Sequence, residues 1–490
     1  MSLRLDGCCV TYLDDGARVS ALEDLSLDVP DGRVVLLTGP SGCGKSTVLR
    51  CVNGLVPAFH EARLTGGVEV DGRSVAEMTL SGLAAAVGTV FQDPRSEFFT
   101  FDVTSELAFP CENLGWEGGS IRRRLGEVAE RVGITGLLGR RLARLSSGEK
   151  QKVAIAVALM PGPRTLLFDE PSANLDDEGL AMLRGLLARL KAEGVSALVA
   201  DHRLAYLDGV MDRCAILDGG RLVDDVGAQE LRERAPAWFA ERGLRRLSPT
   251  GPDDRARGSA GPVGRADHAG RAVPGLRIAG AAVALPGRGP LWRIDDLALP
   301  ERGVIGVTGA NGSGKTTLAR LVLGLLRCRG ARLEIDGRRR RRRARRRRCA
   351  YVMQDVDYQL VAESVLAELL DASAPSARGR ERAEALLERV GLTGLADRHP
   401  LTLSGGQKQR LGIALACMKR ARVVCLDEPT SGLDAAGMRR VAALLREMAD
   451  DGALVLVITH DHELADLAFD HVIHLRNGRA DLRPHHQKEH

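Results

Sequence analysis

Two segments of the sequence place glycines, a lysine and a hydroxyl at the spacing that binds phosphate. GPSGCGKST covers 39–47 and GANGSGKTT covers 309–317, and both match G-x-x-x-x-G-K-[S/T]. The glycines let backbone N–H groups turn toward a phosphate at the start of a helix, the lysine reaches the β- and γ-phosphates, and the hydroxyl can bind Mg²⁺. A Gly-rich structural turn is the alternative, but two matches in register after apolar runs favour phosphate binding. The predicted contacts are Gly39, Gly42, Gly44, Lys45, Ser46 and Thr47 in one segment, and Gly309, Gly312, Gly314, Lys315, Thr316 and Thr317 in the other.

Acidic residues end two further apolar runs, in LLFDEP at 166–171 and VCLDEP at 424–429. Asp169 and Asp427 stand where a carboxylate can reach the magnesium, directly or through water. The next residues, Glu170 and Glu428, are placed to polarise an attacking water. A lone D-E pair would more often be an ordinary strand end, but its distance from a phosphate-binding loop favours catalysis.

Histidines and glutamines complete both sets of candidates. His202 and His460 each follow an apolar run, and their equal distance from the aspartates favours a contact to the γ-phosphate. Glutamine side chains could offer an amide to magnesium and to the attacking water, although glutamine alone is weak evidence. The predicted catalytic residues are Gln92, Glu170, His202, Gln354, Glu428 and His460, and the predicted metal ligands are Ser46, Gln92, Asp169, Thr316, Gln354 and Asp427.

These landmarks occur twice in the same order, which identifies an internal repeat. LSSGEKQ at 145–151 in the first copy corresponds to LSGGQKQ at 403–409 in the second. The spacing between copies is 270 residues at the two lysines, 262 at the glutamines and 258 from LSSGEKQ onward. The second copy has therefore lost eight residues before its glutamine and four after it.

The elements that must position these residues alternate along the chain. Short β-rich runs such as VVLLT and VVCL are separated by helical stretches such as 180–193, so we predict an α/β fold with a mostly parallel sheet in each copy. Ligands bind at the strand ends of such sheets. Residues 249–275 hold six glycines and four prolines, which is linker composition. We predict domains at 1–245 and 276–485, joined by a linker at 246–275, and expect the two domains to pair.

Composition excludes several classes of protein. The 490 residues are 44 % hydrophobic, which rules out disorder of the whole chain. The formal charge is +5, but ten arginines lie within 338–348, so the rest of the chain carries −5 and no general nucleic-acid surface is expected. We find no apolar run near the ~20 residues needed to span a bilayer and no signal-peptide pattern. The ten cysteines form no C-x-x-C pair and are expected to be reduced core residues.

The combined motif set resembles that of ABC ATPases. The resemblance rests on the two phosphate loops, the two glutamines, LSSGEKQ and LSGGQKQ, the two D-E pairs and the two histidines. It implies two tandem ATPase domains, each with a mostly parallel core sheet, an antiparallel β-subdomain and a helical subdomain. It also implies that two ATP molecules with Mg²⁺ lie between the domains, each joining one phosphate loop to the opposite signature. The first loop would then meet Ser404, Gly406 and Gln407, and the second would meet Ser146, Gly148 and Glu149.

Two departures from the family pattern predict unequal ATP sites. The resemblance implies that Tyr12 stacks on adenine, whereas alignment of the copies puts Leu285 at the matching place. The first signature also has Ser147 where the second has Gly405. We therefore expect hydrolysis at both sites, with different rates.

The segments around the glutamines resemble those of energy-coupling-factor (ECF) transporter ATPases, the vitamin and metal-ion uptake group. FQDPRSEFFTFDVTSELAF follows the pattern well in the first copy, with Glu97 in place of an expected glutamine, and the second copy matches in part through Gln359. The resemblance implies a transmembrane coupling protein and a membrane substrate-binding protein as partners, at the cytoplasmic face of the membrane. Phe98, Phe99 and Phe101 form an apolar cluster where such a partner could dock, or else belong to an ordinary helical core.

Several alternatives stay open at this point. The arginine run is expected to be a solvated surface loop, with anionic lipid as the second interpretation and RNA as the third, since no aromatic residues are interleaved. The chain could instead be the twin ATPase of a sugar importer, although one half of those usually has degraded motifs. A ribosome-associated twin-ABC factor is a third class, whose charged helical linker and iron–sulfur cysteines have no match here. The transported substrate is not readable from this chain.

Overall fold

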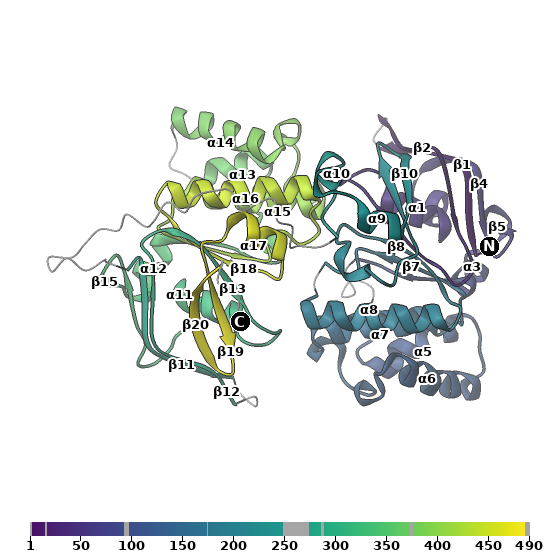
Figure 1. Cartoon of the computed structure of the whole chain (residues 1–490), viewed down its shortest axis with the longest axis horizontal. Helices are drawn as coiled ribbons and strands as arrows, with labels where there is room; N and C mark the ends of the chain where they lie inside the picture. Colours follow the sequence, from purple (N-terminus) through teal and green to yellow (C-terminus); the bar gives the residue numbers. More distant parts are fainter. Residues whose placement is uncertain are drawn as a thin grey trace. The chain divides into compact units, whose positions relative to one another are not determined.

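A computed structural model describes residues 2–14, 17–92, 98–173, 175–247, 274–285, 289–372 and 376–485. The chain divides into two compact units, Met1–Pro249 and Thr250–His490. Each unit contains a six-stranded, mostly parallel sheet and a four-stranded antiparallel sheet, with helices around them (Figure 1). The predicted α/β class is therefore confirmed. Most of the predicted linker lies outside the described residues, and its boundaries stay a prediction.

The core sheet of the first unit has the strand order β10-β9-β3-β8-β7-β6. Neighbouring strands are parallel except for β9 and β10, which form an antiparallel pair at one edge. Its central strand is apolar on both faces: Val34 and Leu36 belong to one hydrophobic core, whereas Val35 and Leu37 belong to another. Because both faces are covered, these strands read as continuous apolar runs in the sequence. The strands are β3 (Val34–Thr38), β6 (Val87–Val90), β7 (Thr165–Asp169), β8 (Ser196–Ala200), β9 (Arg213–Asp218) and β10 (Arg221–Gly227).

One face of this sheet shares its core with the antiparallel subdomain, and the other packs on the helical group. The antiparallel sheet contains β1 (Leu3–Asp14), β2 (Ala17–Val29), β4 (Ala62–Val70) and β5 (Arg73–Ser74). The helical group contains α5 (Val103–Asn113), α6 (Gly118–Val132) and α7 (Ser147–Leu159), which gather at one end of the unit in Figure 1. The other helices are α1 (Lys45–Val52), α2 (Leu55–Ala58), η1 (Val75–Glu77), α3 (Leu80–Ala86), η2 (Thr135–Leu137), η3 (Leu142–Arg144), α8 (Asp177–Ala192), η4 (Ala205–Leu207), α9 (Ala228–Glu233) and α10 (Pro236–Glu241).

The second unit repeats this architecture with the sheet orders β16-β17-β18-β13-β19-β20 and β12-β11-β14-β15. Its strands are β11 (Leu276–Leu285), β12 (Gly289–Leu299), β13 (Gly303–Thr308), β14 (Arg332–Ile335), β15 (Arg338–Arg339), β16 (Cys349–Val352), β17 (Val423–Asp427), β18 (Leu454–Ile458), β19 (His471–Arg476) and β20 (Arg479–Pro484). Its helices are α11 (Lys315–Val322), α12 (Arg342–Arg348), η6 (Val356–Gln359), α13 (Val365–Asp371), α14 (Ala377–Val390), η7 (Thr393–Leu395), η8 (Pro400–Thr402), α15 (Gly405–Lys419), α16 (Ala435–Asp450) and α17 (His462–Ala468).

The residues missing from the second copy map to particular elements. Within the described stretch 315–341, no helix corresponds to α2 or η1 of the first unit. Further on, α5 has 11 residues whereas α13 has 7, which accounts for the four residues lost after the glutamine. The deletions thus shorten peripheral elements and leave the core sheet unchanged.

Most of the arginine run is exposed, as predicted, but the prediction that it is a loop is wrong. The run forms the edge strand β15 and the helix α12, which takes the place of α3 in the first unit. Arg345 is 5 % exposed and occupies the position of the buried Leu83. Its Nε donates to the carbonyl of Val322 at 3.1 Å and its Nη2 to that of Leu321 at 3.2 Å. These carbonyls lie at the end of α11, where they have no donor within the helix and need donors from elsewhere. The guanidinium group of Arg345 supplies them, and this contact helps α12 to form although its arginines repel one another.

A search of the described residues found no helix that is both long and apolar enough to cross a membrane.

Candidate functional site

Both phosphate-binding loops adopt a backbone that requires glycine. Gly44 precedes α1 with φ 106° and Gly314 precedes α11 with φ 96°, and neither helix start has a side-chain cap. A Cβ on Gly39 would lie 2.1 Å from the carbonyl oxygen of Leu217, and one on Gly309 would lie 2.5 Å from that of Leu475. The loops therefore pack closely, and the glycine before each helix offers no side-chain acceptor to the first N–H groups. This arrangement suits an anion such as a phosphate.

The loop lysines fold back over the same backbone. Lys45 is 5 % exposed and its Nζ donates to the carbonyls of Gly39 at 3.0 Å and Pro40 at 3.1 Å. Lys315 repeats the contact, with its Nζ 2.5 Å from the carbonyl of Gly309 and 3.2 Å from that of Ala310. Each ammonium group thus lies over the loop, where it can reach phosphate oxygens.

A hydroxyl and a carboxylate meet beside each loop. The Oγ of Ser46 donates to Asp169 at 3.1 Å, and the Oγ1 of Thr316 donates to Asp427 at 2.9 Å. Burial raises the pKa of Asp169 and of Asp427 above the ordinary value. Paired hard oxygen donors in a partly buried place are the ligands that Mg²⁺ prefers, and its charge would favour the ionised carboxylate. The residues present therefore fit a magnesium ion.

The glutamates after these aspartates have a strained backbone in both copies. Glu170 has φ 45° and Glu428 has φ 49°, in the left-handed region that L-residues rarely adopt. Their N–H groups donate to the last residues of the neighbouring strands, Ala200 at 2.7 Å and Ile458 at 2.8 Å. A conformation that costs energy and yet recurs in both copies is typical of functional sites. The sequence showed no sign of this strain.

In the first unit the three predicted catalytic residues lie together. Gln92 Nε2 donates to Glu170 Oε2 at 2.7 Å, and His202 Nε2 lies 3.6 Å from Glu170 Oε1. Burial first, and then the nearby carboxylates of Asp201 and Asp169, raise the pKa of Glu170 to about 8. The neutral form of this carboxyl group is therefore favoured at pH 7 when no nucleotide or metal is bound.

In the second unit different groups contact the acidic pair. Thr459 Oγ1 donates to Glu428 Oε2 at 3.2 Å, and the hydroxyl of Tyr351 donates to Asp427 at 3.1 Å. Gln354 follows β16 and His460 follows β18, the same places that their counterparts take in the first unit. The second glutamate thus accepts from a hydroxyl at the sequence position that Asp201 takes in the first copy.

The residue responsible for this difference was missed from the sequence. Asp201 is 2 % exposed and accepts from the hydroxyls of Ser172 and Tyr206, both at 2.9 Å. Thr459 takes its sequence position in the second copy, and Asp461, two residues later, accepts at 2.7 Å from Thr430, the counterpart of Ser172. An alignment of ADHR at 200–203 with ITHD at 458–461 could have shown the difference. The aspartate precedes the histidine in the first copy and follows it in the second.

The two signature segments begin helices through capping boxes. Ser146 caps α7 and Glu149 returns to its backbone N–H at 2.8 Å, whereas Ser404 caps α15 and Gln407 returns at 2.9 Å. Arg140 pairs with Glu149 at 2.9 Å. Gly148 and Gly406 lie in the first turns. The helix starts are thereby ordered, and their pairing with the opposite phosphate loops stays a prediction.

Of the two residues predicted at the adenine positions, Tyr12 and Leu285, the structure describes the side chain of Tyr12. The hydroxyl of Tyr12 lies 3.3 Å from Thr47 Oγ1, so its ring is beside the helix that follows the first phosphate loop. Leu285 ends β11, and its side chain lies outside the described residues, as does the whole of Glu97. Gln359 fixes the second copy's loop by accepting from Met353 N–H at 2.9 Å and donating to the carbonyl of Tyr351 at 2.8 Å.

A buried glutamate folds the segment after each glutamine. Glu106 is 1 % exposed and accepts from the N–H groups of Phe99 at 3.1 Å and Thr100 at 2.8 Å. Its counterpart Glu368 accepts from those of Val361 at 2.9 Å and Ala362 at 2.7 Å. These two carboxylates had no role assigned from the sequence.

The same segments carry the most exposed large apolar side chains of the described chain. Phe99 is 75 % exposed, Phe101 91 %, Tyr358 78 % and Val361 87 %. Phe98 packs against the core, whereas Phe99 stacks on Phe109 at the surface, and docking of a partner at these phenylalanines stays a prediction. We call Phe99, Phe101, Tyr358 and Val361 the apolar knobs.

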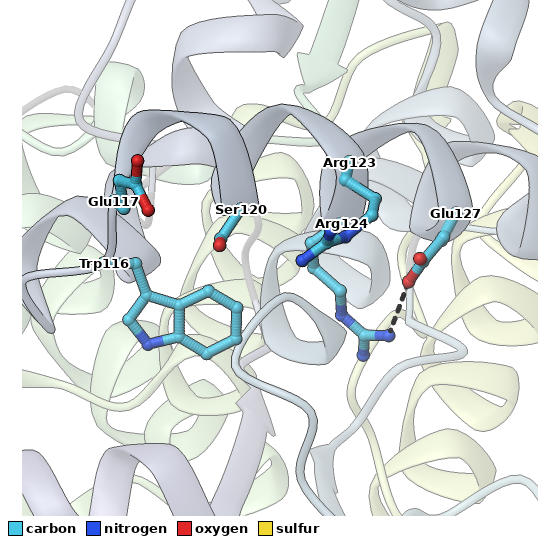
Figure 2. Close-up of a pocket in the computed structure, with 6 residues that line it drawn as sticks. All are labelled: Trp116, Glu117, Ser120, Arg123, Arg124 and Glu127. Atoms are coloured by element: carbon cyan, nitrogen blue, oxygen red, sulfur yellow. Dashed lines mark hydrogen bonds and ion pairs between the residues drawn. The ribbon is translucent and has the colours of Figure 1, made fainter.

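A surface pocket on α6 is separate from these sites. Figure 2 shows Trp116, Ser120 and Arg123 around it, with Arg124 paired to Glu127 at 3.4 Å. Arg124 also donates to the carbonyls of Leu159 and Met160, so its role there is structural. None of the predicted nucleotide-binding residues lines this pocket.

Comparison with known proteins identifies the family. The family model described as "ABC transporter" matches residues 22–173 and 294–431. A "putative ABC transporter ATP-binding protein" of Treponema denticola is 36 % identical over 470 residues, covering 96 % of this chain and 94 % of the relative. The "putative HMP/thiamine import ATP-binding protein YkoD" of Bacillus subtilis is 30 % identical over 494 residues, covering 97 % and 90 %.

Solved structures agree on the fold. A chain of the "Model of ribosome-bound archaeal Pelota and ABCE1" matches with a TM-score of 0.69 at 24 % identity, covering 98 % of this chain and 79 % of that one. Identity at this level supports the twin-domain architecture and nothing more. The chain therefore belongs to the ABC transporter ATP-binding proteins: it carries two ATP-binding domains in tandem and is an ATP hydrolase.

Proposed function

We propose that the chain is the ATPase subunit of an ECF-type transporter, which energises uptake of a vitamin, a vitamin precursor or a metal ion. Its partners would be a transmembrane coupling protein and a membrane substrate-binding protein, with the chain at the cytoplasmic face. The full-length relative named for HMP and thiamine import supports this class of solute. So does the match around the two glutamines described above.

The observation that carries the proposal is the pair of apolar knob segments. Both units hold two large apolar side chains in water within nine residues after the glutamine, on segments that a buried glutamate keeps folded. Exposed apolar side chains held in a fixed place are typical of a surface that another protein covers. Because Gln92 contacts Glu170, a partner bound at the segment that follows Gln92 in the sequence could influence the hydrolytic centre through this glutamine.

The chain's own residues account for the chemistry. The two loops and their lysines would bind the phosphates, while the serine or threonine hydroxyl and the aspartate would hold magnesium. Bound magnesium would neutralise charge on the β- and γ-phosphates. Glu170 or Glu428 would accept the proton of the attacking water, and the glutamine and histidine beside it would orient the reactants. Contacts of the γ-phosphate to both domains would favour closure with ATP over ADP.

Affinity purification from membranes tests the proposal. The tagged chain, expressed at a low level, would be isolated from membranes in mild detergent and its co-purifying proteins identified. We expect one multi-spanning protein and one small membrane protein. Serine at the four knobs (F99S/F101S/Y358S/V361S) should abolish their recovery while leaving ATP binding intact.

A matched control removes four other exposed apolar side chains that lie away from the glutamines, in V19S/L80S/V223S/L467S. This variant should still recover both membrane proteins. Recovery of a sugar-importer permease, or of ribosomal subunits without membrane protein, would contradict the proposal and identify the alternative.

A further inference from the structure

We propose that the arginine run of the second unit binds the anionic headgroups of a phospholipid membrane. The surface consists of five exposed side chains, here called the outward arginines: Arg338, Arg339, Arg341, Arg343 and Arg347. They extend along β15 and α12, which lie at one edge of the second unit in Figure 1.

Other arginines of the run fasten this surface to the protein. Arg342 Nε donates to the carbonyl of Gly324 at 3.0 Å, Arg346 Nε to the same carbonyl at 3.3 Å, and Arg345 to Val322 and Leu321 as described above. Positions 342, 345 and 346 share one face of a helix. The opposite face, with Arg343 and Arg347, is therefore held toward solvent in a fixed orientation.

The outward arginines make no ion pair with any described residue, although Glu334 of β14 stands opposite Arg339 of β15. Within the described part of the chain, the one ion pair made by residues 338–348 joins Arg348 to Asp336 at 3.9 Å, and Asp336 is already paired with Arg422 at 2.6 Å. Five guanidinium groups in such proximity repel one another, so a surface of many negative charges would relieve the repulsion. Guanidinium groups also bind phosphate through two parallel hydrogen bonds.

Nucleotide chemistry does not require this surface. The corresponding helix α3 of the first unit has the sequence LSGLAAA, with no charged residue. Both units nevertheless have the same sheet order and the same phosphate loop. The outward arginines therefore serve a purpose specific to the second unit.

A lipid surface fits the surroundings better than a nucleic acid. Leu325, whose carbonyl accepts from Arg342 at 3.2 Å, has a side chain that is 49 % exposed beside the run. An apolar side chain among cationic ones suits the boundary between headgroups and acyl chains. Single-stranded nucleic acids instead need aromatic side chains for stacking, and residues 325–348 contain none.

Vesicle sedimentation with the purified full chain tests the proposal. The probes are vesicles of phosphatidylcholine alone and vesicles with 30 % phosphatidylglycerol, at 0.1 M and 0.5 M NaCl. We expect binding to the anionic vesicles and loss of binding at high salt, because salt screens the attraction. Each arginine near an anionic surface is expected to contribute about fivefold, so R338Q/R339Q/R341Q/R343Q/R347Q should weaken binding at least about a hundredfold.

The matched control changes the net charge equally at five other exposed arginines, in R378Q/R398Q/R439Q/R476Q/R479Q, and should bind the anionic vesicles as the parent does. Equal weakening in both variants would reduce the effect to net charge and overturn the proposal. Absence of binding to anionic vesicles, or tighter binding to RNA at equal phosphate concentration, would also overturn it. The assay contains no membrane protein, so its failure would leave the transport proposal intact.

Discussion

The hydrolytic centres of the two domains are built on equivalent strands but differ in the group that lies beside the glutamate. Beside Glu170 lies the buried carboxylate of Asp201, whereas beside Glu428 lies the hydroxyl of Thr459, which donates to it. The second copy keeps an aspartate as well, but two residues later, where it accepts from Thr430. Because Thr430 takes the place of Ser172, a buried carboxylate accepts from the equivalent hydroxyl in both copies, and the difference beside Glu428 is the hydroxyl donor of Thr459.

The difference bears on which domain hydrolyses ATP faster. A carboxyl group acts as a base only when it is ionised, and a second buried carboxylate opposes ionisation. A hydroxyl that donates to the carboxylate favours the ionised form instead. We therefore expect the glutamate of the second copy to be the more effective base at neutral pH.

Removal of each glutamate should have unequal effects. We expect Glu428→Gln to lower steady-state ATP turnover about a hundredfold, since a positioned base contributes about that much or more. Glu170→Gln should lower it less than about tenfold. Turnover by the purified chain at saturating ATP and Mg²⁺ measures both, and identical losses would contradict the inequality.

Exchange of the neighbouring residues should transfer the difference. Thr459→Asp would place a carboxylate beside Glu428, and we expect turnover to fall about tenfold at pH 7. The mirror change, Asp201→Asn, removes the carboxylate beside Glu170 and keeps a group that can accept from Ser172 or Tyr206. It should raise the residual turnover of the Glu428→Gln protein several-fold, and a decrease there would argue that Asp201 assists catalysis.

The pH dependence should separate the two bases. The pKa of Glu170 is raised to about 8, so its ionised fraction grows as pH rises from 7 to 9. In the Glu428→Gln protein we expect turnover to rise about tenfold over that range, because the ionised fraction of Glu170 grows from near one tenth at pH 7 to near nine tenths at pH 9. The Glu170→Gln protein should show a flatter profile. Matching profiles in the two variants would exclude different base pKa values.

The smallest effect, on stability, is expected at the position where the first copy has Leu83 and the second has Arg345. Arg345 fills the place of Leu83, and each is buried. Arg345→Leu should therefore change the free energy of unfolding of the second unit by less than about 1 kcal/mol, since the apolar side chain offsets the lost hydrogen bonds. A change of that size moves the melting temperature by about 2–4 °C for a domain of this length, which calorimetry resolves. A drop above 10 °C would show that the carbonyls of Leu321 and Val322 need their donors.

The sequence by itself determined the two-domain α/β architecture and most of the candidate residues. Phosphate loops, strand-end carboxylates and signature segments follow local rules: the spacing of a few residues specifies a turn, a strand end or a helix start. Because parallel strands bring their carboxyl ends to one edge, Ser46 could be expected beside Asp169 although 123 residues separate them.

Tertiary structure alone decided the groups around those residues. Whether a carboxylate is favourable depends on its neighbours and its burial, so the effect of Asp201 on Glu170 required both positions in space. The left-handed backbone of Glu170 and Glu428 depends on the neighbouring strand and has no local signature. The arginine run was expected to be a loop because its repulsion is visible in the sequence, whereas the carbonyls of α11 that accept from Arg342 and Arg345 are supplied by another element. Motifs made of consecutive residues can be identified from the sequence. The groups that compensate a charge come from other elements, so they are known only once the chain is folded.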